Sequence, residues 1–571
     1  MKNKFLFFFF IFFVCGIFSP LNSQNWLWGR AGNSNSSAEG ISIAADDAGA
    51  VYFGGSYTAA SISFGTITLT NPYGNDGFLV KYDSTGNVLW AKNFDGPGAE
   101  IVYNVSTDHF GNVFVIGEFS SASMTIDAAT LFNASSSGFS YDIFIVKFDG
   151  SGNLIYAKRE GGIDNDWGYS IAEDGLGNSY FTGMFTSSSI TFGATTLTNV
   201  NPGMADLFIT QYDPLGNPVW AKSAGGNAED YGISLAADAA GNVFLTGYFS
   251  SPTLSFGTST ISNAGGGTYD ILLAEYNITG NLIRVQSLGG PYTDFANYIS
   301  IDASDNIFIA GAFYSQTINF GSVNLANTDI TGGSSDAFLV KSDSAGNFQW
   351  AKQAGGSNVE NGWSVSDDNN GNIYFIGHFY SPSIQIDNNT IYYPANGTDP
   401  VFIVKYDEAG NLICYSSLIS GGDDEIAVAG DAFGNVFVGG DFVPTPFILG
   451  NDTLSSNGFE APFVAKYRCE EMIVVPPPQT DCEIYIPNAF SPNNDGQNDF
   501  ECVRGNCIQS IHFAIYDRWG EKVFESSDQN VCWDGTYRGV KLENAVFYYT
   551  LDAVLLNGDK IQKSGNISLV K

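Results

Sequence analysis

Hydrophobic and polar residues alternate along this chain in short stretches that are separated by Gly, Asn and Asp. Alternation with a period of two places apolar side chains on one face of a strand, so these stretches are predicted to be β strands. The segment Ser234–Gly247 has two such stretches around an Asp-x-x-Gly-Asn turn, in which Asp bonds its own backbone and Gly or Asn accepts positive φ. No long stretch has the apolar spacing of three and four residues that a helix requires, so we predict an all-β fold.

A segment that contains this turn recurs with a nearly constant period. Its second residue falls at positions 50, 112, 178, 242, 306, 372 and 435. A period of this size indicates stacked supersecondary units. Each unit also holds a second hairpin, such as residues 76–92, and so contains four strands, which we name A to D from the centre outward. Four-stranded units arranged radially are the blades of a β-propeller, and the recurrence predicts seven blades.

The two ends of the repeat region complete each other, which favours a closed propeller over an open solenoid with capped ends. Residues 25–30 match the D strand at 87–92, but no A, B or C strand precedes them. Residues 463–467 match a C strand, but no D strand follows them. We therefore expect these segments to pair, closing the ring and hiding its edges, with Trp28 buried in the joint.

The repeats resemble the bacterial seven-bladed β-propeller repeat family, of SBBP type, whose pattern runs Asp-x-x-Gly-Asn-Val-Tyr-x-Thr-Gly. The segment from Asp238 to Gly247 matches this pattern, and the resemblance covers roughly residues 25–468. The resemblance implies a seven-bladed propeller over residues 24–468. It does not identify a ligand, because propellers host unrelated functions.

The repeat pattern ends after Tyr467. A linker is predicted at residues 469–481, since consecutive prolines favour a semi-rigid extended chain. Alternating segments at 511–516, 546–551 and 565–570 then predict further strands. Residues 482–571 are therefore predicted to form a small antiparallel β-sandwich, immunoglobulin-like in type.

Three ordered motifs in this last part, at residues 486–499, 515–520 and 533–536, resemble the gliding-motility-associated C-terminal family. That family is the type B sorting domain of the type IX secretion system. The resemblance implies that the secretion machinery recognises this domain and carries the protein across the outer membrane. The residues that carry the motifs are Pro487, Asn488, Phe490, Pro492, Asn493, Asp495, Gly496, Asn498, Asp499, Arg518, Trp519, Gly520, Trp533, Asp534 and Gly535.

Residues 1–23 have the pattern of a secretory signal peptide. Lys2 and Lys4 precede an apolar run from Phe5 to Phe18, which is too short for a membrane span of about 20 residues. Gln24 is the predicted mature start, and no other segment is apolar enough to span a membrane. The expected partners in export are therefore the Sec translocon and the type IX machinery. The expected location is the cell surface or the extracellular space.

The formal net charge of −36 limits the kinds of partner. A surface of this sign repels nucleic acid and anionic membrane, so we predict no nucleic-acid partner. It favours cations or basic ligands, or it keeps an exported protein soluble.

One acidic position recurs just before the A strand in most blades. If A strands line a channel, these carboxylates would ring one mouth and attract a cation or a basic ligand. The alternative, which we favour, is that each carboxylate pairs with a neighbouring lysine, such as Lys92 or Lys222, or with backbone N–H groups. The residues are Glu100, Asp166, Asp230, Asp294, Glu360 and Asp423.

A calcium loop is considered at residues 491–496, where Asn493 and Asp495 supply oxygens and Gly496 takes the turn position. The twelfth position is Cys502 instead of the bidentate Glu, so we favour a tight turn and expect no other cofactor. The cysteines cluster late in the chain, apart from Cys414, and their connectivity is open. Cys414 takes an aromatic position of its blade and is interpreted as a core thiol.

Catalysis has little support, because the three histidines lie in different units and no serine has a nucleophile-elbow pattern. The recurring Trp90, Tyr156, Trp220 and Trp350 indicate packing, whereas ligand candidates are residues that break the repeat: Trp167, Trp363 and Arg284. We therefore predict a non-enzymatic binding or adhesion protein for an extracellular protein or glycan. The alternative is an exported propeller enzyme that acts on polysaccharide or peptide.

Overall fold

The computed structural model of this chain describes residues 24–72, 74–135, 140–393, 399–419, 426–443, 447–457, 460–469, 484–493, 498–505, 508–555 and 560–571. The predicted signal peptide and nearly all of the predicted linker lie outside these ranges. The regular elements within them are all strands, so the all-β prediction is confirmed. In the part of the chain that is described, no helix has the length and apolar character to cross a membrane.

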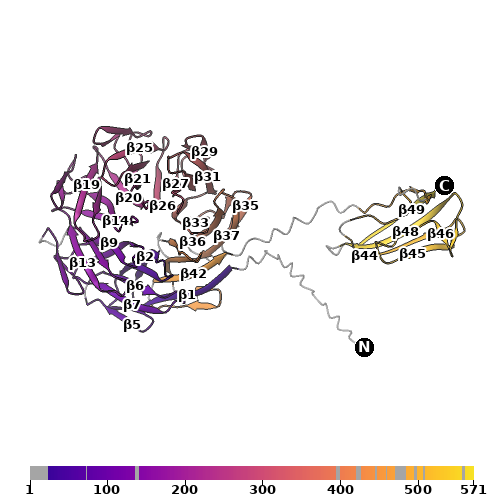
Figure 1. Ribbon diagram of the computed structural model, residues 1–571, viewed down its shortest axis with the longest axis horizontal. Coiled ribbons are helices and arrows are strands. Elements are labelled where there is room, and N and C mark those ends of the chain that lie inside the picture. The colour runs from indigo at the N-terminus through magenta and orange to yellow at the C-terminus, as the bar shows by residue number, and fades with distance from the viewer. Residues whose placement is uncertain are drawn as a thin grey trace, which may run out of the picture. The chain divides into compact units, whose positions relative to one another are not determined.

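Residues 24–469 form four-stranded antiparallel sheets that share one strand order. In the first, β2 (Ala38–Ala45) pairs with β3 (Val51–Tyr57), β3 with β6 (Asp76–Tyr82), and β6 with β7 (Val88–Phe94). Seven sheets with this order occur among the described residues. Figure 1 shows them around a central axis, with strands such as β2, β14, β20 and β26 innermost. This arrangement is a β-propeller.

The strands of the other sheets occupy the same four positions. The A strands are β8 (Glu100–Thr107), β14 (Asp166–Glu173), β20 (Asp230–Ala237), β26 (Asp294–Ile301), β32 (Glu360–Asp367) and β38 (Ala427–Gly430). The B strands are β9 (Val113–Phe119), β15 (Ser179–Phe185), β21 (Val243–Phe249), β27 (Ile307–Phe313), β33 (Asn372–Phe379) and β39 (Val436–Phe442). The C strands are β12 (Asp142–Phe148), β18 (Asp206–Tyr212), β24 (Asp270–Tyr276), β30 (Asp336–Ser342), β36 (Pro400–Asp407) and β42 (Ala461–Cys469). The D strands are β13 (Leu154–Glu160), β19 (Pro218–Ala224), β25 (Leu282–Leu288), β31 (Phe348–Gly355), β37 (Leu412–Ile419) and β1 (Gln24–Ser34).

A small hairpin follows each B strand and accounts for the segment between the two main hairpins. These hairpins are β4 (Ser61–Phe64) with β5 (Ile67–Thr70), β10 (Ser123–Ile126) with β11 (Ala129–Phe132), β16 (Ser189–Phe192) with β17 (Thr195–Thr198), β22 (Thr253–Phe256) with β23 (Ser259–Ser262), β28 (Thr317–Phe320) with β29 (Val323–Ala326), β34 (Ser383–Ile386) with β35 (Asn389–Tyr392), and β40 (Phe447–Leu449) with β41 (Asp452–Leu454).

The last sheet is built from both ends of the repeat region. Strand β1 pairs antiparallel with β42, from Gln24 opposite Cys469 to Ala31 opposite Phe463. It thereby takes the D position that β38, β39 and β42 leave open. Trp28 is only 7% exposed and lies 6.0 Å from Phe437 and 6.5 Å from Tyr82, between ring centroids. Since the innermost strands β38 and β2 also contact each other, the ring of sheets is closed.

The turn between the C and D strands is fixed by local hydrogen bonds. In the second sheet, Asp149 accepts hydrogen bonds from the backbone N–H groups of Ser151 and Asn153 and from the Asn153 amide. The Asn153 side-chain bond and these backbone bonds lower the pKa of Asp149. Gly152 has φ of +82°, which only glycine adopts without strain. The Asp-x-x-Gly-Asn pattern therefore forms the tight turn that the sequence predicts.

In six of the seven described sheets, a large D-strand side chain packs on this turn of the next sheet, a contact that we call the clasp. Trp28, Trp90, Trp220 and Trp350 donate their indole N–H groups to turn carbonyls of Ser84, Gly150, Ile278 and Glu408, at 3.1, 3.3, 3.1 and 3.2 Å. A Cβ on the turn glycine would meet the indole ring, at 2.9 Å for Gly86 against Trp28. The turn therefore requires glycine for close approach as well as for its φ.

Arg284 forms the clasp of its sheet. Its guanidinium donates to the Ser344 carbonyl at 3.1 Å and pairs with Glu275 at 2.6 Å. The residue breaks the repeat because it replaces an aromatic side chain in the clasp. Its break of the repeat thus has a structural reason, and ligand binding by Arg284 stays a prediction.

Cys414 occupies the same D-strand position in β37, but it is bonded to Cys469. The interpretation as a free core thiol is therefore wrong. Cys469 ends β42, where the other sheets have the first residues of the C–D turn. In this sheet the D strand comes from the N-terminus, so no C–D turn exists to receive a clasp. The disulfide takes the place of the clasp at this interface.

The second unit comprises described residues from 484 onward, and the chain divides into two compact units between Met472 and Ile473. Its sheet has the order β43 (Ala489–Phe490), β49 (Lys560–Leu569), β48 (Ala545–Leu555), β44 (Ile508–Tyr516), β45 (Lys522–Ser526). A separate hairpin joins β46 (Thr536–Tyr537) to β47 (Val540–Lys541). Strand β43 pairs parallel to β49, so the sheet is not wholly antiparallel as predicted. A C-terminal β domain thus follows the propeller.

The Cys414–Cys469 disulfide is expected to stabilise the propeller selectively. Replacing both Cys414 and Cys469 by Ala should cost the propeller about 2–5 kcal/mol, the usual effect of removing a native disulfide. The double variant Cys502→Ala with Cys532→Ala removes the disulfide within the second unit and is the matched control. Calorimetry of the oxidised mature chain should show a lowered propeller transition only for the first variant. Equal propeller transitions in the two variants would contradict the proposed clasp.

Candidate functional site

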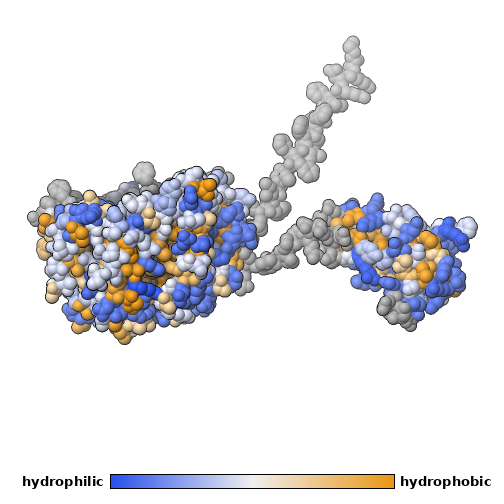
Figure 2. Space-filling view, turned by 90° about the horizontal axis from the view of Figure 1, so that it is seen from above, coloured by the Kyte–Doolittle hydropathy of each residue, from blue (hydrophilic) through white to orange (hydrophobic). Residues whose placement is uncertain are grey.

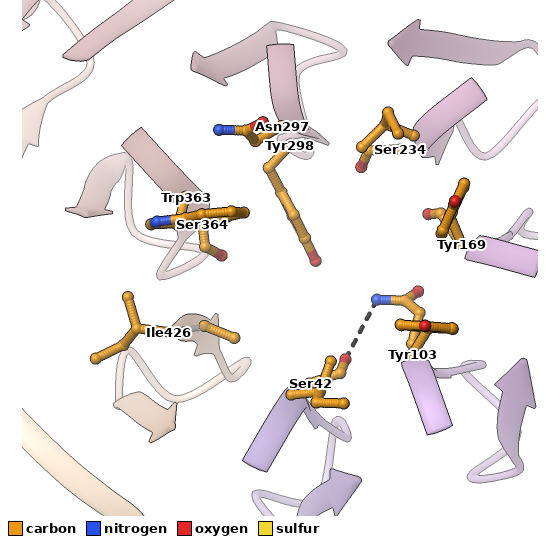
Figure 3. Close-up of a pocket in the computed structure, with 14 residues that line it drawn as sticks. Ser42, Tyr103, Tyr169, Ser234, Asn297, Tyr298, Trp363, Ser364 and Ile426 are labelled. Atoms are coloured by element: carbon orange, nitrogen blue, oxygen red, sulfur yellow. Dashed lines mark hydrogen bonds between the residues drawn. The ribbon is translucent and has the colours of Figure 1, made fainter. Parts of the chain in front are cut away.

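A channel runs along the axis of the propeller and widens into a cavity of about 170 Å³ (Figure 3). Its walls come from the fourth and fifth residues of each A strand, or their equivalents. The same two repeat positions of the seven sheets therefore face one another. The fourth-position residues are Ile41, Tyr103, Tyr169, Ile233, Asn297, Trp363 and Ile426, and the fifth-position residues are Ser42, Asn104, Ser170, Ser234, Tyr298, Ser364 and Ala427.

Tyr298 and Asn104 divide the channel. Four of the other sheets have serine at this position, whereas the Tyr298 side chain reaches toward the axis in Figure 3. Asn104 donates to Ser42 Oγ at 3.2 Å and accepts the Ile171 N–H at 3.1 Å. Tyr298 and Asn104 also line a second cavity of about 260 Å³ toward the other end of the channel. Tyr298 and Asn104 therefore close one end of the first cavity, which we call the upper cavity.

The recurring carboxylates do not line the upper cavity. Each of the five described members is fully buried, and Asp423 lies outside the described residues. Ser187, Ser251 and Ser315 donate their hydroxyls to Asp166, Asp230 and Asp294 at 2.8, 2.8 and 2.7 Å. Ser121 donates to Glu100 in the same way, and the Ser381 N–H donates to Glu360.

These contacts tie the start of an A strand to the segment after the B strand. Glu100, Asp166, Asp230, Asp294 and Glu360 do not reach solvent, which agrees with the favoured alternative of local pairing and not with a carboxylate ring at the mouth. The partners are serine hydroxyls and backbone N–H groups, and the suggested Lys92 pairs with Asp127 at 2.8 Å instead. Burial raises the pKa to about 8 for Glu100 and Glu360, about 7 for Asp230, and about 6 for Asp166 and Asp294.

Aromatic side chains gather at the mouth of the upper cavity, two residues before the cavity wall. They include the second A-strand residues Trp167, Tyr231 and Phe295 and lie on neighbouring sheets. Tyr248 lies 5.2 Å from Tyr231 and 5.2 Å from Phe295, between ring centroids. Each of these four side chains is partly exposed. We call Tyr141, Trp167, Tyr231, Tyr248, Tyr269 and Phe295 the aromatic arc.

Polar groups accompany the arc. Tyr231 donates its hydroxyl to Glu229 at 3.1 Å, and burial together with the Glu229 charge raises the pKa of Tyr231. Tyr103 in the cavity wall donates to Glu118 at 3.2 Å, and burial raises the pKa of Glu118 to about 8. Neither the cavity wall nor the arc contains lysine or arginine. The mouth is thus aromatic and acidic.

Two of the three blade-specific ligand candidates lie here. Trp167 belongs to the arc and Trp363 to the cavity wall, whereas Arg284 lies in a clasp. The sequence-based search did not identify Tyr231, Tyr248, Tyr269 or Phe295. A comparison of the second A-strand residue would have found two of them, because that position reads Glu39, Ile101, Trp167, Tyr231, Phe295 and Asn361 along the blades.

The remaining site predictions lie elsewhere. Asn493 is described, whereas its partners Asp495 and Gly496 in the considered calcium loop lie outside the described residues. Within the described ranges, no group of three or more His, Cys, Asp or Glu residues is arranged to hold a metal ion. His109 and His512 are exposed and pair with Asp47 and Glu525, and His378 is buried in another sheet.

Comparison with known proteins supports the second unit most directly. Residues 484–569 match the model of the CHU_C Type IX secretion signal domain. The C-terminal domain therefore carries a type IX sorting signal, which implies handling by that machinery and export across the outer membrane.

Curated relatives of the chain are distant. The chain is 24% identical over 503 residues to the uncharacterized WD repeat-containing protein L264 of Acanthamoeba polyphaga mimivirus, covering 70% of this chain and 34% of that protein. It is 25% identical over 227 residues to the regulatory protein FlaEY of Caulobacter vibrioides, covering 39% of this chain and 23% of that protein. The chain thus spans about a third or less of the length of these curated relatives.

Similar solved structures include two from different functional classes. A polysaccharide lyase, PL25 ulvan lyase, has a TM-score of 0.35 at 11% identity, covering 72% of this chain and 93% of that chain. The extracellular domain of the putative one component system BT4673 from B. thetaiotaomicron has a TM-score of 0.14 at 10% identity, covering 96% and 100%. Neither likeness bears on ligand or activity.

The buried acids predict a pH dependence of stability. Their folded-state pKa lies above the unfolded value of about 4, so the protonated acid favours the folded state and this stabilisation is lost as pH rises through the folded value. The propeller should therefore melt at a lower temperature at about pH 8.5 than at about pH 5.5. Replacing Glu100 and Glu360 by Gln should reduce that difference.

A control is needed because general charge repulsion also grows with pH. Asp47→Asn with Glu408→Gln removes the same number of carboxylates from side chains that are 60% and 61% exposed. This variant should keep the pH difference of the parent. A Glu100→Gln, Glu360→Gln variant with an unchanged pH difference would contradict the assignment.

Proposed function

We propose that this protein is a non-enzymatic binding or adhesion protein that type IX secretion delivers to the cell surface or the extracellular space. Its propeller holds an extracellular ligand over the aromatic arc, at the mouth of the upper cavity. We also infer that the repeats are of the seven-bladed SBBP type, which the seven four-stranded sheets support.

The aromatic arc is the observation that carries the binding function. Clasp residues recur in nearly every blade because they hold neighbouring sheets together. The arc positions are aromatic in only some blades, and the six residues lie on neighbouring sheets, those that begin with β8, β14, β20 and β26. Partly exposed aromatic side chains that break a structural repeat are typical of recognition surfaces.

The chemistry of the arc favours a neutral glycan as the ligand. Aromatic rings offer flat apolar faces, and the Tyr hydroxyls at their edges stay protonated at neutral pH, so they donate hydrogen bonds. A sugar ring offers the matching apolar C–H face and hydroxyl edge. Glu229 and the net charge of −36 disfavour uronates, sulfated sugars and phosphates. A basic protein is the competing ligand class.

One pair of residues supports the enzymatic alternative. Tyr103 and Glu118 are hydrogen-bonded at the cavity wall, and burial raises the pKa of Glu118 to about 8, within the range of a general acid. In an exported enzyme that acts on polysaccharide or peptide, Glu118 would serve as the general acid, with Tyr103 as its hydrogen-bond partner. Glu118 is 3% exposed, so a substrate would have to reach it through Tyr103.

A glycan array with the mature chain tests the proposal, followed by calorimetry on each glycan that binds. Tyr231→Ala and Phe295→Ala should each weaken binding by about tenfold or more, since central aromatic contacts are worth about 2 kcal/mol or more. Phe132→Ala is the matched control, because Phe132 is 70% exposed on a peripheral hairpin. Equal affinities in all three variants would place the ligand elsewhere.

Chemical analysis of the bound glycan separates the two functions. The proposal predicts that the glycan is recovered intact after prolonged incubation. Cleavage that is abolished by Glu118→Gln would establish the enzymatic alternative. Binding to basic proteins alone would replace the glycan by the competing ligand class.

A further inference from the structure

The turn between β44 and β45 of the C-terminal domain exposes a tryptophan. Trp519 is 83% exposed, although burying a side chain of this size is strongly favourable. Figure 2 shows that hydrophobic residues also reach the surface of this unit at other places. Trp519 differs from them because it is a large aromatic residue at the tip of a turn.

The turn itself does not require tryptophan. Asp517 accepts the backbone N–H groups of Trp519 and Glu521 at 2.8 and 2.9 Å, and Gly520 takes φ of +84°. These contacts involve only the backbone of residue 519, so a small polar residue would form the same turn. The indole side chain therefore has no role in folding that the structure shows.

The other tryptophan of the sorting motifs has the opposite placement. Trp533 is 1% exposed, packs against Phe490 and Phe547 at 5.2 and 4.9 Å, and donates its indole N–H to the Thr536 carbonyl at 2.9 Å. The sorting-motif residues thus divide into two groups. Phe490 and Trp533 build the core, whereas Arg518 and Trp519 face solvent.

A second hairpin adds to the exposed group. Glu521 accepts the Tyr537 hydroxyl at 2.8 Å and lies 3.8 Å from the Arg538 guanidinium, so β46–β47 is held beside the β44–β45 turn. Arg538 lies 4.9 Å above the Tyr537 ring, and Arg518 lies 5.6 Å above the Trp519 ring. We call Arg518, Trp519, Tyr537 and Arg538 the recognition tip. Only the first two belong to the sorting motifs.

The composition of the tip matches a protein interface. Trp, Tyr and Arg are the residues that most often dominate the energy of protein–protein binding. The Arg538 side chain is 78% exposed, and it presents a positive charge in a chain whose net charge is −36. A partner that binds this tip needs an apolar pocket for the indole and carboxylates at the rim.

We propose that the recognition tip is the surface by which the type IX secretion machinery binds this domain. The partner is a protein of that machinery, because residues 484–569 match a secretion signal domain. The buried motif residues hold the two hairpins in place and do not touch the partner. This assignment is independent of the ligand of the propeller.

Export of the full chain from a bacterium with a type IX system tests the proposal. The double variant Trp519→Ala, Arg538→Glu should accumulate in the periplasm, with at least tenfold less protein outside the cell than the parent. Tyr548→Ala is the matched control, since Tyr548 is a 46% exposed aromatic residue on β48 of the same domain. It should be exported like the parent.

Melting of the purified variants separates recognition from folding. The tip variant should melt like the parent, whereas Trp533→Ala should lower the melting temperature of the domain and block export through misfolding. The single variant Arg538→Glu, at a residue that is outside the core, gives the same readout if Trp519→Ala proves unstable. Parental export of the tip variants overturns the proposal, and so does a block of export by Tyr548→Ala that equals theirs.

Discussion

The pairing of β1 with β42 is the interaction on which the propeller depends. A β sheet with an open edge exposes unpaired backbone N–H and C=O groups, which invite pairing with other chains. A linear array of sheets also leaves an apolar face uncovered at each end. This chain removes both liabilities by splitting one sheet between its ends, so that Gln24 and Cys469 lie opposite each other. Closure then brings the A strands together and creates the channel.

At each interface of the ring, a D-strand side chain contacts the next sheet at the same position, but the chemical nature of the contact differs. Most sheets use an aromatic ring on a glycine turn, one uses the Arg284 guanidinium, and one uses the Cys414–Cys469 disulfide. The disulfide lies where the split sheet lacks a C–D turn. The substitution follows from closure itself, since supplying the D strand from the N-terminus removes the turn that would receive the side chain.

The sequence predicts the features that repeat, but it does not predict side-chain contacts between residues that are far apart in the chain. The Asp-x-x-Gly-Asn turn is a local pattern, and the period and the split sheet follow from comparing copies of one repeat along the chain. Cys414 was assigned as a core thiol because its partner, Cys469, is on the next sheet. For acids such as Asp166 the sequence predicts pairing with lysine or backbone N–H groups, but not with the serine hydroxyls, because partners such as Ser187 follow 21 residues later, after the B strand. Trp167 was predicted from its break in symmetry, and Tyr231 and Phe295 share its repeat position. Tyr141, Tyr248 and Tyr269 join the arc only once neighbouring sheets are placed together.

The most direct test of ring closure by β1 is calorimetry of the mature chain carrying Trp28→Ala. Trp28 is 7% exposed in the joint, whereas its neighbour Leu27 is 47% exposed, so Leu27→Ala is the matched control. We expect Trp28→Ala to destabilise the propeller transition by about 3–5 kcal/mol and Leu27→Ala to have little effect. Equal propeller transitions in the parent and in Trp28→Ala would show that the ring does not depend on this strand.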